Sequence, residues 1–198
     1  MSVRAFSLFF ALLTVGANAF VGLVAVLAVA SRFSGGAAAA LRWVRDMVGG
    51  SSLVLAWIVA TVATLGSLYY SEVARFVPCE LCWYQRIAMY PLAVVLGIAA
   101  VRSDFGIRRY VLPLVSIGAA ISVYHYQLER FPAQTSLACT VDVPCTTVWV
   151  WEFHYISIPF MALSAFALIA TVLLLGPSTA EAPSAGGFDG VTEEGMSR

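Results

Sequence analysis

Five long apolar runs constrain the fold of this chain more than any other feature of its sequence. They cover residues 5–31, 51–70, 83–101, 110–126 and 156–176, and about 20 mainly apolar residues suffice for a helix to cross a bilayer. Hydrophobic residues make up 61% of the chain and charged residues only 11%, whereas about a quarter of the residues in soluble domains are charged. The formal net charge is zero, which gives no support for nucleic-acid binding. The sequence therefore predicts an all-α integral membrane protein.

The first apolar run has two interpretations. Residues 5–31 carry no charge and are long enough to span a bilayer. A cleaved signal peptide is the alternative, because the Ala-Asn-Ala segment at 17–19 resembles a small-residue cleavage site. The apolar run continues past that segment to Ala30, so we expect a retained transmembrane helix.

The remaining chain divides into three expected parts. Residues 1–50 form the N-terminal helix and a cytoplasmic connector, 51–176 form a four-helix core, and 177–198 form a disordered cytoplasmic tail rich in Gly, Ser, Glu and Pro. Within the connector, residues 37–48 predict either a short amphipathic helix on the membrane surface or an ordinary polar link.

The distribution of arginine orients the spans. Successive spans alternate sides, so residues 32–50, residues 102–109 and the C-terminal tail share one side and hold seven of the eleven basic residues. Cytoplasmic loops carry the positive excess, which leaves residues 71–86 and 127–155 on the outside. Both cysteine pairs lie in these outside segments, where disulfides persist.

The segment Pro-Cys-Glu-Leu-Cys-Trp-Tyr-Gln-Arg at 78–86 carries the most chemical information. Cys79 and Cys82 form a C-x-x-C motif, which by itself suits zinc, an iron–sulfur cluster or dithiol redox chemistry. Pro78 suits a turn before a helix, so we expect Cys82 in the first helical turn, where the helix dipole and unpaired N–H groups favour a thiolate. A thiolate is the reactive form in disulfide exchange.

Three polar residues are candidates to act beside this motif. Arg86 lies four residues after Cys82, on the same helical face. We expect its guanidinium to stabilise a Cys82 thiolate or an oxygen of a bound quinone. The alternative is that the side chain only extends to the membrane–water interface and has no role in the chemistry. Gln85 is placed to add a hydrogen bond or to be solvated. His125 is a candidate proton carrier, because imidazole titrates near neutrality, or a polar anchor.

The second cysteine pair admits three interpretations. Cys139 and Cys145 enclose five residues, an interval that a disulfide can close. The pair is then a structural link, or a second redox disulfide in relay with the first pair. Four sulfurs could also bind zinc tetrahedrally. An oxidising compartment and the wide second interval fit zinc poorly, so we favour the relay and expect no metal.

These features together resemble the DsbB/BdbC family of disulfide-bond formation proteins. The resemblance rests on Cys-Glu-Leu-Cys-Trp-Tyr-Gln-Arg-Ile at 79–87, Met-Tyr-Pro at 89–91, Tyr124-His125, the second cysteine pair, and Ile-Ser-Ile-Pro-Phe at 156–160. It covers about 51–176 and implies a four-helix transmembrane bundle. The extra N-terminal transmembrane helix departs from the four spans usual in the family.

The resemblance implies a quinone-dependent enzyme of the bacterial cell (inner) membrane. Such a protein reoxidises an extracytoplasmic thioredoxin-fold thiol oxidase, DsbA-like or BdbD-like, and passes electrons to ubiquinone or menaquinone. By the same resemblance, the partner attacks the second disulfide at Cys139, and Cys145 then attacks Cys79. Cys82 is freed beside the quinone, with Arg86 stabilising the charge. Two other hypotheses remain: a vitamin K epoxide reductase-like enzyme, and a non-enzymatic membrane protein with structural disulfides or zinc.

Overall fold

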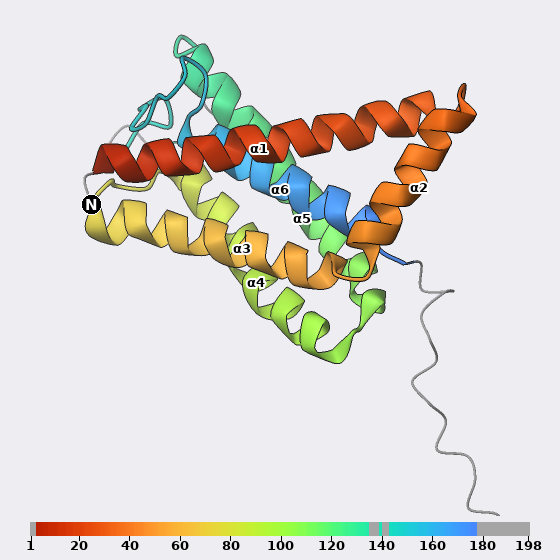
Figure 1. Cartoon of the computed structure of the whole chain (residues 1–198). Coiled ribbons are helices and arrows are strands. Elements are labelled where there is room, and N and C mark those ends of the chain that lie inside the picture. Colours follow the sequence, from red (N-terminus) through yellow and green to blue (C-terminus); the bar gives the residue numbers. More distant parts are fainter. Residues whose placement is uncertain (1–2, 135–138, 140–142, 178–198) are drawn as a thin grey trace, which may run out of the picture.

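The computed structural model describes residues 3–134, 139 and 143–177 (Figure 1). The elements are α1 (Val3–Ala30), α2 (Gly35–Gly49), α3 (Ser52–Leu68), the π-helical turn η1 (Tyr69–Val73), α4 (Glu80–Arg102), the 3₁₀ turn η2 (Phe105–Ile107), α5 (Arg108–Arg130) and α6 (Ile158–Leu175). Within these residues, five helical segments are long and apolar enough to cross a membrane. The predicted class, an all-α integral membrane protein, is confirmed. The predicted disordered tail lies outside the described residues from Ser178 onward.

The helices extend past the apolar runs that predicted them. Helix α4 begins at Glu80, before the apolar run that starts at residue 83, and α5 covers Arg108–Arg130 rather than only 110–126. An apolar run marks the residues that suit hydrocarbon, whereas a helix can continue into the polar headgroup region. At α4 the helix start after Pro78, with Cys82 in the first helical turn, is confirmed.

Helices α3 to α6 form a bundle in which α3 packs on α4, α4 on α5, α5 on α6, and α6 on α3. Its buried core is made of Leu53, Ala56, Ala60, Ala88, Met89, Leu92, Leu96, Ala99, Val111, Val115, Phe166, Ile169 and Leu173. Lipid tails are as apolar as these side chains, so close packing rather than water exclusion holds the helices together. At Gly118, the ring of Phe166 occupies the space that a Cβ would need, which lets α5 and α6 approach closely.

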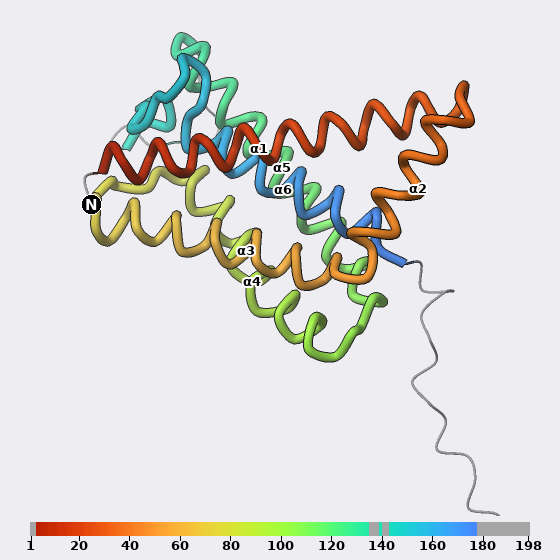
Figure 2. Tube along the Cα trace, in the orientation of Figure 1, coloured from red at the N-terminus to blue at the C-terminus, as the bar shows by residue number. Residues whose placement is uncertain are grey.

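Helix α1 lies along α6, and α2 leads the chain back to α3 (Figure 2). Asn18 Nδ2 on α1 donates a hydrogen bond to Ser164 Oγ on α6 at 2.7 Å, and Tyr70 OH and Ser7 Oγ are 3.2 Å apart. Polar bonds of this kind contribute to helix association in membranes. The predicted N-terminal helix is confirmed, and α2 contains the helix predicted over 37–48. Retention of α1 in the mature protein and the position of α2 at a membrane surface stay predictions.

One end of the bundle gathers the start of α1, the segment 74–79 and the described parts of the loop 131–157 (Figure 1). We call it the cysteine end. There the π-helical turn ends α3, with the Ala74 N–H donating to the Tyr69 carbonyl at 3.0 Å. The loop closes before α6 with an antiparallel bridge between Glu152 and Ile156. The C-terminal end of α6 lies at the opposite end of the bundle (Figure 1).

Candidate functional site

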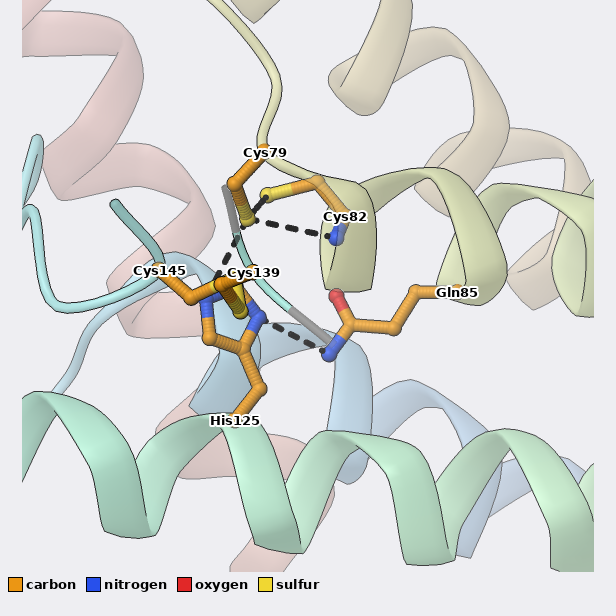
Figure 3. The surroundings of a disulfide bond; sticks show 6 residues. All are labelled: Cys79, Cys82, Gln85, His125, Cys139 and Cys145. Atoms are coloured by element: carbon orange, nitrogen blue, oxygen red, sulfur yellow. Dashed lines mark hydrogen bonds between the residues drawn. A yellow bond between two sulfur atoms is a disulfide. The ribbon is translucent and has the colours of Figure 1, made fainter. Parts of the chain in front are cut away.

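The C-x-x-C motif forms the start of α4. Cys79 is the N-cap residue, and its Sγ accepts a hydrogen bond from the backbone N–H of Cys82 at 3.4 Å. The two Sγ atoms lie 2.9 Å apart (Figure 3), whereas a disulfide bond is about 2.05 Å long. Only a small movement therefore separates the dithiol from a disulfide.

His125 on α5 lies against this pair. Its Nε2 is 3.6 Å from Cys79 Sγ, and its Nδ1 is 3.4 Å from Gln85 Nε2 (Figure 3). His125 is 2% exposed and Gln85 is 6% exposed. With the amide in this orientation its nitrogen is a donor, which assigns Nδ1 as the acceptor and the proton to Nε2. The ring then donates to the Cys79 sulfur.

These contacts favour a thiolate on Cys79, which lies just before the membrane-spanning segment. The Cys82 thiol lowers the pKa of Cys79 most; burial opposes the shift, and His125 and the Cys82 N–H add to it, giving a pKa of about 4. The sequence argument places the thiolate on Cys82, in the first helical turn. The geometry instead directs a helix-start N–H to Cys79, because the N-cap side chain folds back over the helix.

The second cysteine pair packs on the first. Cys139 and Cys145 form a disulfide with their Cα atoms 5.9 Å apart, and it lies beside His125 and Cys79 in Figure 3. Cys145 is 2% exposed and belongs to one apolar cluster with Cys79 and Leu81, whereas Cys139 is only partly buried at the edge of that cluster. The structure therefore brings all four cysteines together, and Cys139 is the more exposed residue of the second pair.

A large apolar cavity borders the other side of Cys82. Its volume is about 620 Å³, within the usual range for pockets that hold small organic ligands. Cys82, Gln85 and Arg86 line it from α4, and apolar side chains of α1, α3 and α6 line the rest. We call it the acceptor cavity.

Three aromatic rings line the acceptor cavity at the cysteine end. Tyr70 stacks on Phe76 with ring centroids 5.7 Å apart, and Phe76 stacks on Trp149 at 4.9 Å. The stack forms part of the cavity wall at the cysteine end.

Arg86 is held at the polar end of the cavity. Its Nη2 donates to the Ser67 carbonyl at 3.3 Å, its guanidinium carbon lies 5.3 Å from the Trp83 ring centroid, and Tyr90 OH and Ser67 Oγ are 3.2 Å apart. A guanidinium has five N–H donors, so one bond to α3 uses only part of its capacity. These contacts orient Arg86 and leave it able to donate to a bound oxygen.

A second, much smaller cavity lies on the Cys79 side of the pair. Its volume is about 20 Å³, and its lining includes Cys79, Cys82, His125 and Glu129. One carboxylate oxygen of Glu129 is buried without a hydrogen-bond partner among the described residues. Nothing in the sequence identified Glu129, because its approach to the cysteines depends on how α5 packs against α4.

Cys79, Cys82 and His125 are the described residues that could hold a metal ion. Their ligand atoms lie within 4.8 Å of one another, and two thiolates with an imidazole suit zinc. The second pair is joined as a disulfide, and a disulfide sulfur is not a thiolate ligand. The four-sulfur zinc site considered from the sequence therefore does not form in this state.

A thiol pair packed against a disulfide at the end of a bundle of membrane-length helices is an arrangement suited to thiol–disulfide exchange. The sequence profile described as Disulfide bond formation protein DsbB matches residues 50–176, and the chain belongs to that family. Family membership confirms the resemblance drawn from the motifs. It favours a thiol oxidoreductase of disulfide formation over a vitamin K epoxide reductase-like enzyme and over a protein whose cysteines only stabilise it.

Proteins named for disulfide formation are similar to this chain in sequence. Disulfide bond formation protein C of Bacillus subtilis (strain 168) is 49% identical over 119 residues, which cover 60% of this chain and 86% of that protein. A probable disulfide formation protein of Deinococcus radiodurans is 48% identical over 126 residues, covering 59% and 82% of the two chains. No solved structure shows significant similarity.

Proposed function

We propose that this protein oxidises an extracytoplasmic thioredoxin-fold thiol oxidase, of DsbA or BdbD type, and passes the electrons to a membrane quinone. One observation carries the proposal: Cys82 borders the acceptor cavity with Arg86, while Cys79 packs against the second disulfide. The two pairs thereby connect Cys139, the more exposed cysteine of the second pair, with an apolar cavity lined by membrane helices.

The burial of the cysteines supports the order of exchange. A partner thiolate attacks Cys139, the more exposed of the two cysteines, and Cys145 leaves as a thiolate. Cys145 then attacks Cys79, its neighbour in the buried cluster, which breaks the Cys79–Cys82 bond and frees Cys82. The partner's second thiol releases the partner as a disulfide and frees Cys139.

The relay then resets its second pair. Cys139 attacks Cys145, which restores their disulfide and leaves Cys79 and Cys82 as thiols. The described structure has this arrangement, with a Cys139–Cys145 disulfide and two thiols at 79 and 82. Regeneration of the first disulfide removes two electrons and two protons from that pair.

The acceptor cavity suits a quinone, which when bound takes up two electrons and two protons. Arg86 and Gln85 supply polar groups at one end of an otherwise apolar lining. Arg86 stabilises negative charge that develops on an acceptor oxygen, as a charge-assisted donor. His125 Nε2–H and the Cys82 N–H hold the negative charge on Cys79. Strongly oxidising partner proteins have reduction potentials of about −120 mV. Their reoxidation therefore needs an electron acceptor with a higher reduction potential.

The proposal also orients the protein in the membrane. The excess of arginine on the loops opposite the cysteine end supports an extracytoplasmic position for both cysteine pairs in a bacterial cell membrane. Residues 51–176 act as the catalytic core, residues 1–50 as an added helix with a cytoplasmic connector, and 177–198 as a cytoplasmic tail.

Coupled measurement of thiols and quinone tests the proposed function. Purified protein in lipid nanodiscs is mixed with a reduced DsbA-like protein and a quinone, and free thiols and quinone absorbance are followed together. We expect one quinone reduced for each partner dithiol oxidised. Thiol loss that needs no quinone, or equal turnover by the wild type and Cys82→Ser, would contradict the proposal.

A further inference from the structure

Helix α1 lies outside the residues that match the family, yet it borders the acceptor cavity. The family profile matches 50–176, whereas α1 covers Val3–Ala30. The side chains that α1 contributes to the cavity lining include Phe10, Leu12, Leu13, Thr14, Ala17 and Phe20. Helix α1 is therefore one wall of the cavity that Cys82 and Arg86 border.

Contacts at two levels fix α1 in this position. Near the cysteine end, Phe6 stacks on Tyr69 with ring centroids 3.5 Å apart. A Cβ on Gly66 would lie 2.6 Å from the Phe10 ring, so glycine at this position of α3 admits that ring. Deeper in the bundle, Asn18 donates to Ser164 at 2.7 Å. A polar amide in a membrane helix is costly unless it finds such a partner.

The acceptor cavity is elongated along the bundle. Its lining on α3 extends from Leu55 to Ser67, which corresponds to about 18 Å of helix at 1.5 Å per residue. The charged and amide groups of the lining, Arg86 and Gln85, lie near the cysteine end. The hydroxyl of Thr14 farther along donates within its own helix, to the Phe10 carbonyl at 2.8 Å. A polar end and a long apolar slot suit a ligand with a polar head and an apolar tail.

We propose that α1 forms, with α3 and α6, a binding site for the apolar tail of the electron acceptor, a prenyl-type chain. This inference rests on the proposed function, which places the head of the acceptor beside Cys82 and Arg86. From there the slot leads away from the cysteine end, and α1 faces the tail. Helix α1 thus raises the affinity for tailed acceptors over acceptors that consist of the ring alone.

Two alanines on α1 supply a matched pair for testing this site. Ala17 lines the cavity, whereas Ala19 is exposed elsewhere on the same helix. Ala17→Trp places a large side chain in the slot, and Ala19→Trp adds the same bulk toward lipid. Ala17→Leu and Ala19→Leu repeat the comparison with less bulk, so that the test does not depend on one tryptophan variant folding.

Binding is measured without turnover, in protein that also carries Cys82→Ser. The probes are a benzoquinone with four isoprene units and the same ring with none, and the readout is quenching of tryptophan fluorescence, to which Trp149 in the cavity lining contributes. We expect Ala17→Trp to weaken binding of the tailed quinone about tenfold, since it displaces a few methylene groups, and to leave the ring alone within about twofold. Ala19→Trp should change neither affinity.

Several outcomes would overturn the tail site. Equal affinity of the wild type for the two quinones, or an equal loss for both in Ala17→Trp, would contradict it. So would a copurified phospholipid that the tailed quinone does not displace, because the slot would then hold bilayer acyl chains. Tail-dependent binding without any quinone-linked thiol oxidation by the wild type would contradict the proposed function instead, so the two failures are distinguishable.

Discussion

The two sulfurs of the C-x-x-C motif face environments that differ in size and polarity. Cys79 borders a cavity of about 20 Å³ with His125 and Glu129, and it packs with the buried Cys145. Cys82 also borders the acceptor cavity of about 620 Å³, whose lining is mainly apolar and carries Arg86 at one end.

This difference shows how adjacent thiols can serve two substrates. The N-cap position places Cys79 beside His125 and the second disulfide, while Cys82, in the first turn of α4, also borders the acceptor cavity. A single motif can then exchange disulfides on one side and deliver electrons on the other. Changes on either side should therefore have separable effects.

The largest effect is expected from Cys82→Ser. Loss of the sulfur that borders the acceptor cavity should lower quinone-linked turnover by at least about a hundredfold, since no disulfide can form at 79 and 82. The Cys139–Cys145 disulfide should still oxidise one equivalent of reduced partner, measured by trapping free thiols. As the matched control, Cys145→Ser should abolish this single exchange as well.

The next largest effect is expected from Arg86→Ala, which should weaken the use of quinone and leave disulfide exchange with the partner intact. Removing a charged donor from the acceptor cavity should raise the quinone KM by about 10- to 100-fold, as expected for a hydrogen bond to a charged group. Exchange between the partner and the second disulfide should stay within about twofold. A quinone dependence equal to that of the wild type would contradict the role of Arg86.

His125→Ala should act on the Cys79 side alone. The imidazole helps hold the pKa of Cys79 at about 4, so its loss raises that pKa and leaves less thiolate at acidic pH. Alkylation of the reduced pair by iodoacetamide should slow about fivefold at pH 5 and be unchanged at high pH.

The exposed His154 supplies the control. His154→Ala should leave the pH profile of alkylation unaltered, and a parallel shift in both variants would argue against a specific contact with Cys79.

The lowered pKa of Cys79 also stabilises the folded dithiol form at high pH. This contribution should decline as the pH falls from the ordinary thiol value of 9.0 toward 4.

The smallest effect is expected on stability, from Asn18→Leu. Loss of the hydrogen bond to Ser164 removes one interhelical polar contact, worth about 0.6 kcal/mol in membrane proteins. The unfolding temperature should fall by a few degrees at most, followed by circular dichroism in detergent. Alkylation of Cys79 should not change, since α1 packs on the acceptor-cavity side.

The spans and the four cysteines could be predicted from the sequence because their signals are local. A run of about 20 apolar residues specifies a membrane helix, and the C-x-x-C motif with Arg86 lies within one helical segment. The ends of the spans were predicted less accurately at α4 and α5, because these helices continue into polar sequence.

The contacts across helices could not be predicted, because no periodicity encodes them. The approach of His125 to Cys79 and Gln85 depends on how α5 packs on α4, and the favoured thiolate depends on the side-chain direction of the N-cap. The same holds for α1, whose sequence predicts a span but not the cavity wall that it forms.

Protection of individual cysteines tests most directly whether the two sulfurs face different substrates. The reduced protein is treated with an apolar maleimide, with and without a tailed quinone analogue that cannot accept electrons, and labelling at each cysteine is read by mass spectrometry. We predict that the analogue protects Cys82 strongly and leaves Cys79 and Cys139 labelled as before. Equal protection of Cys79 and Cys82, or protection of neither, would contradict the account.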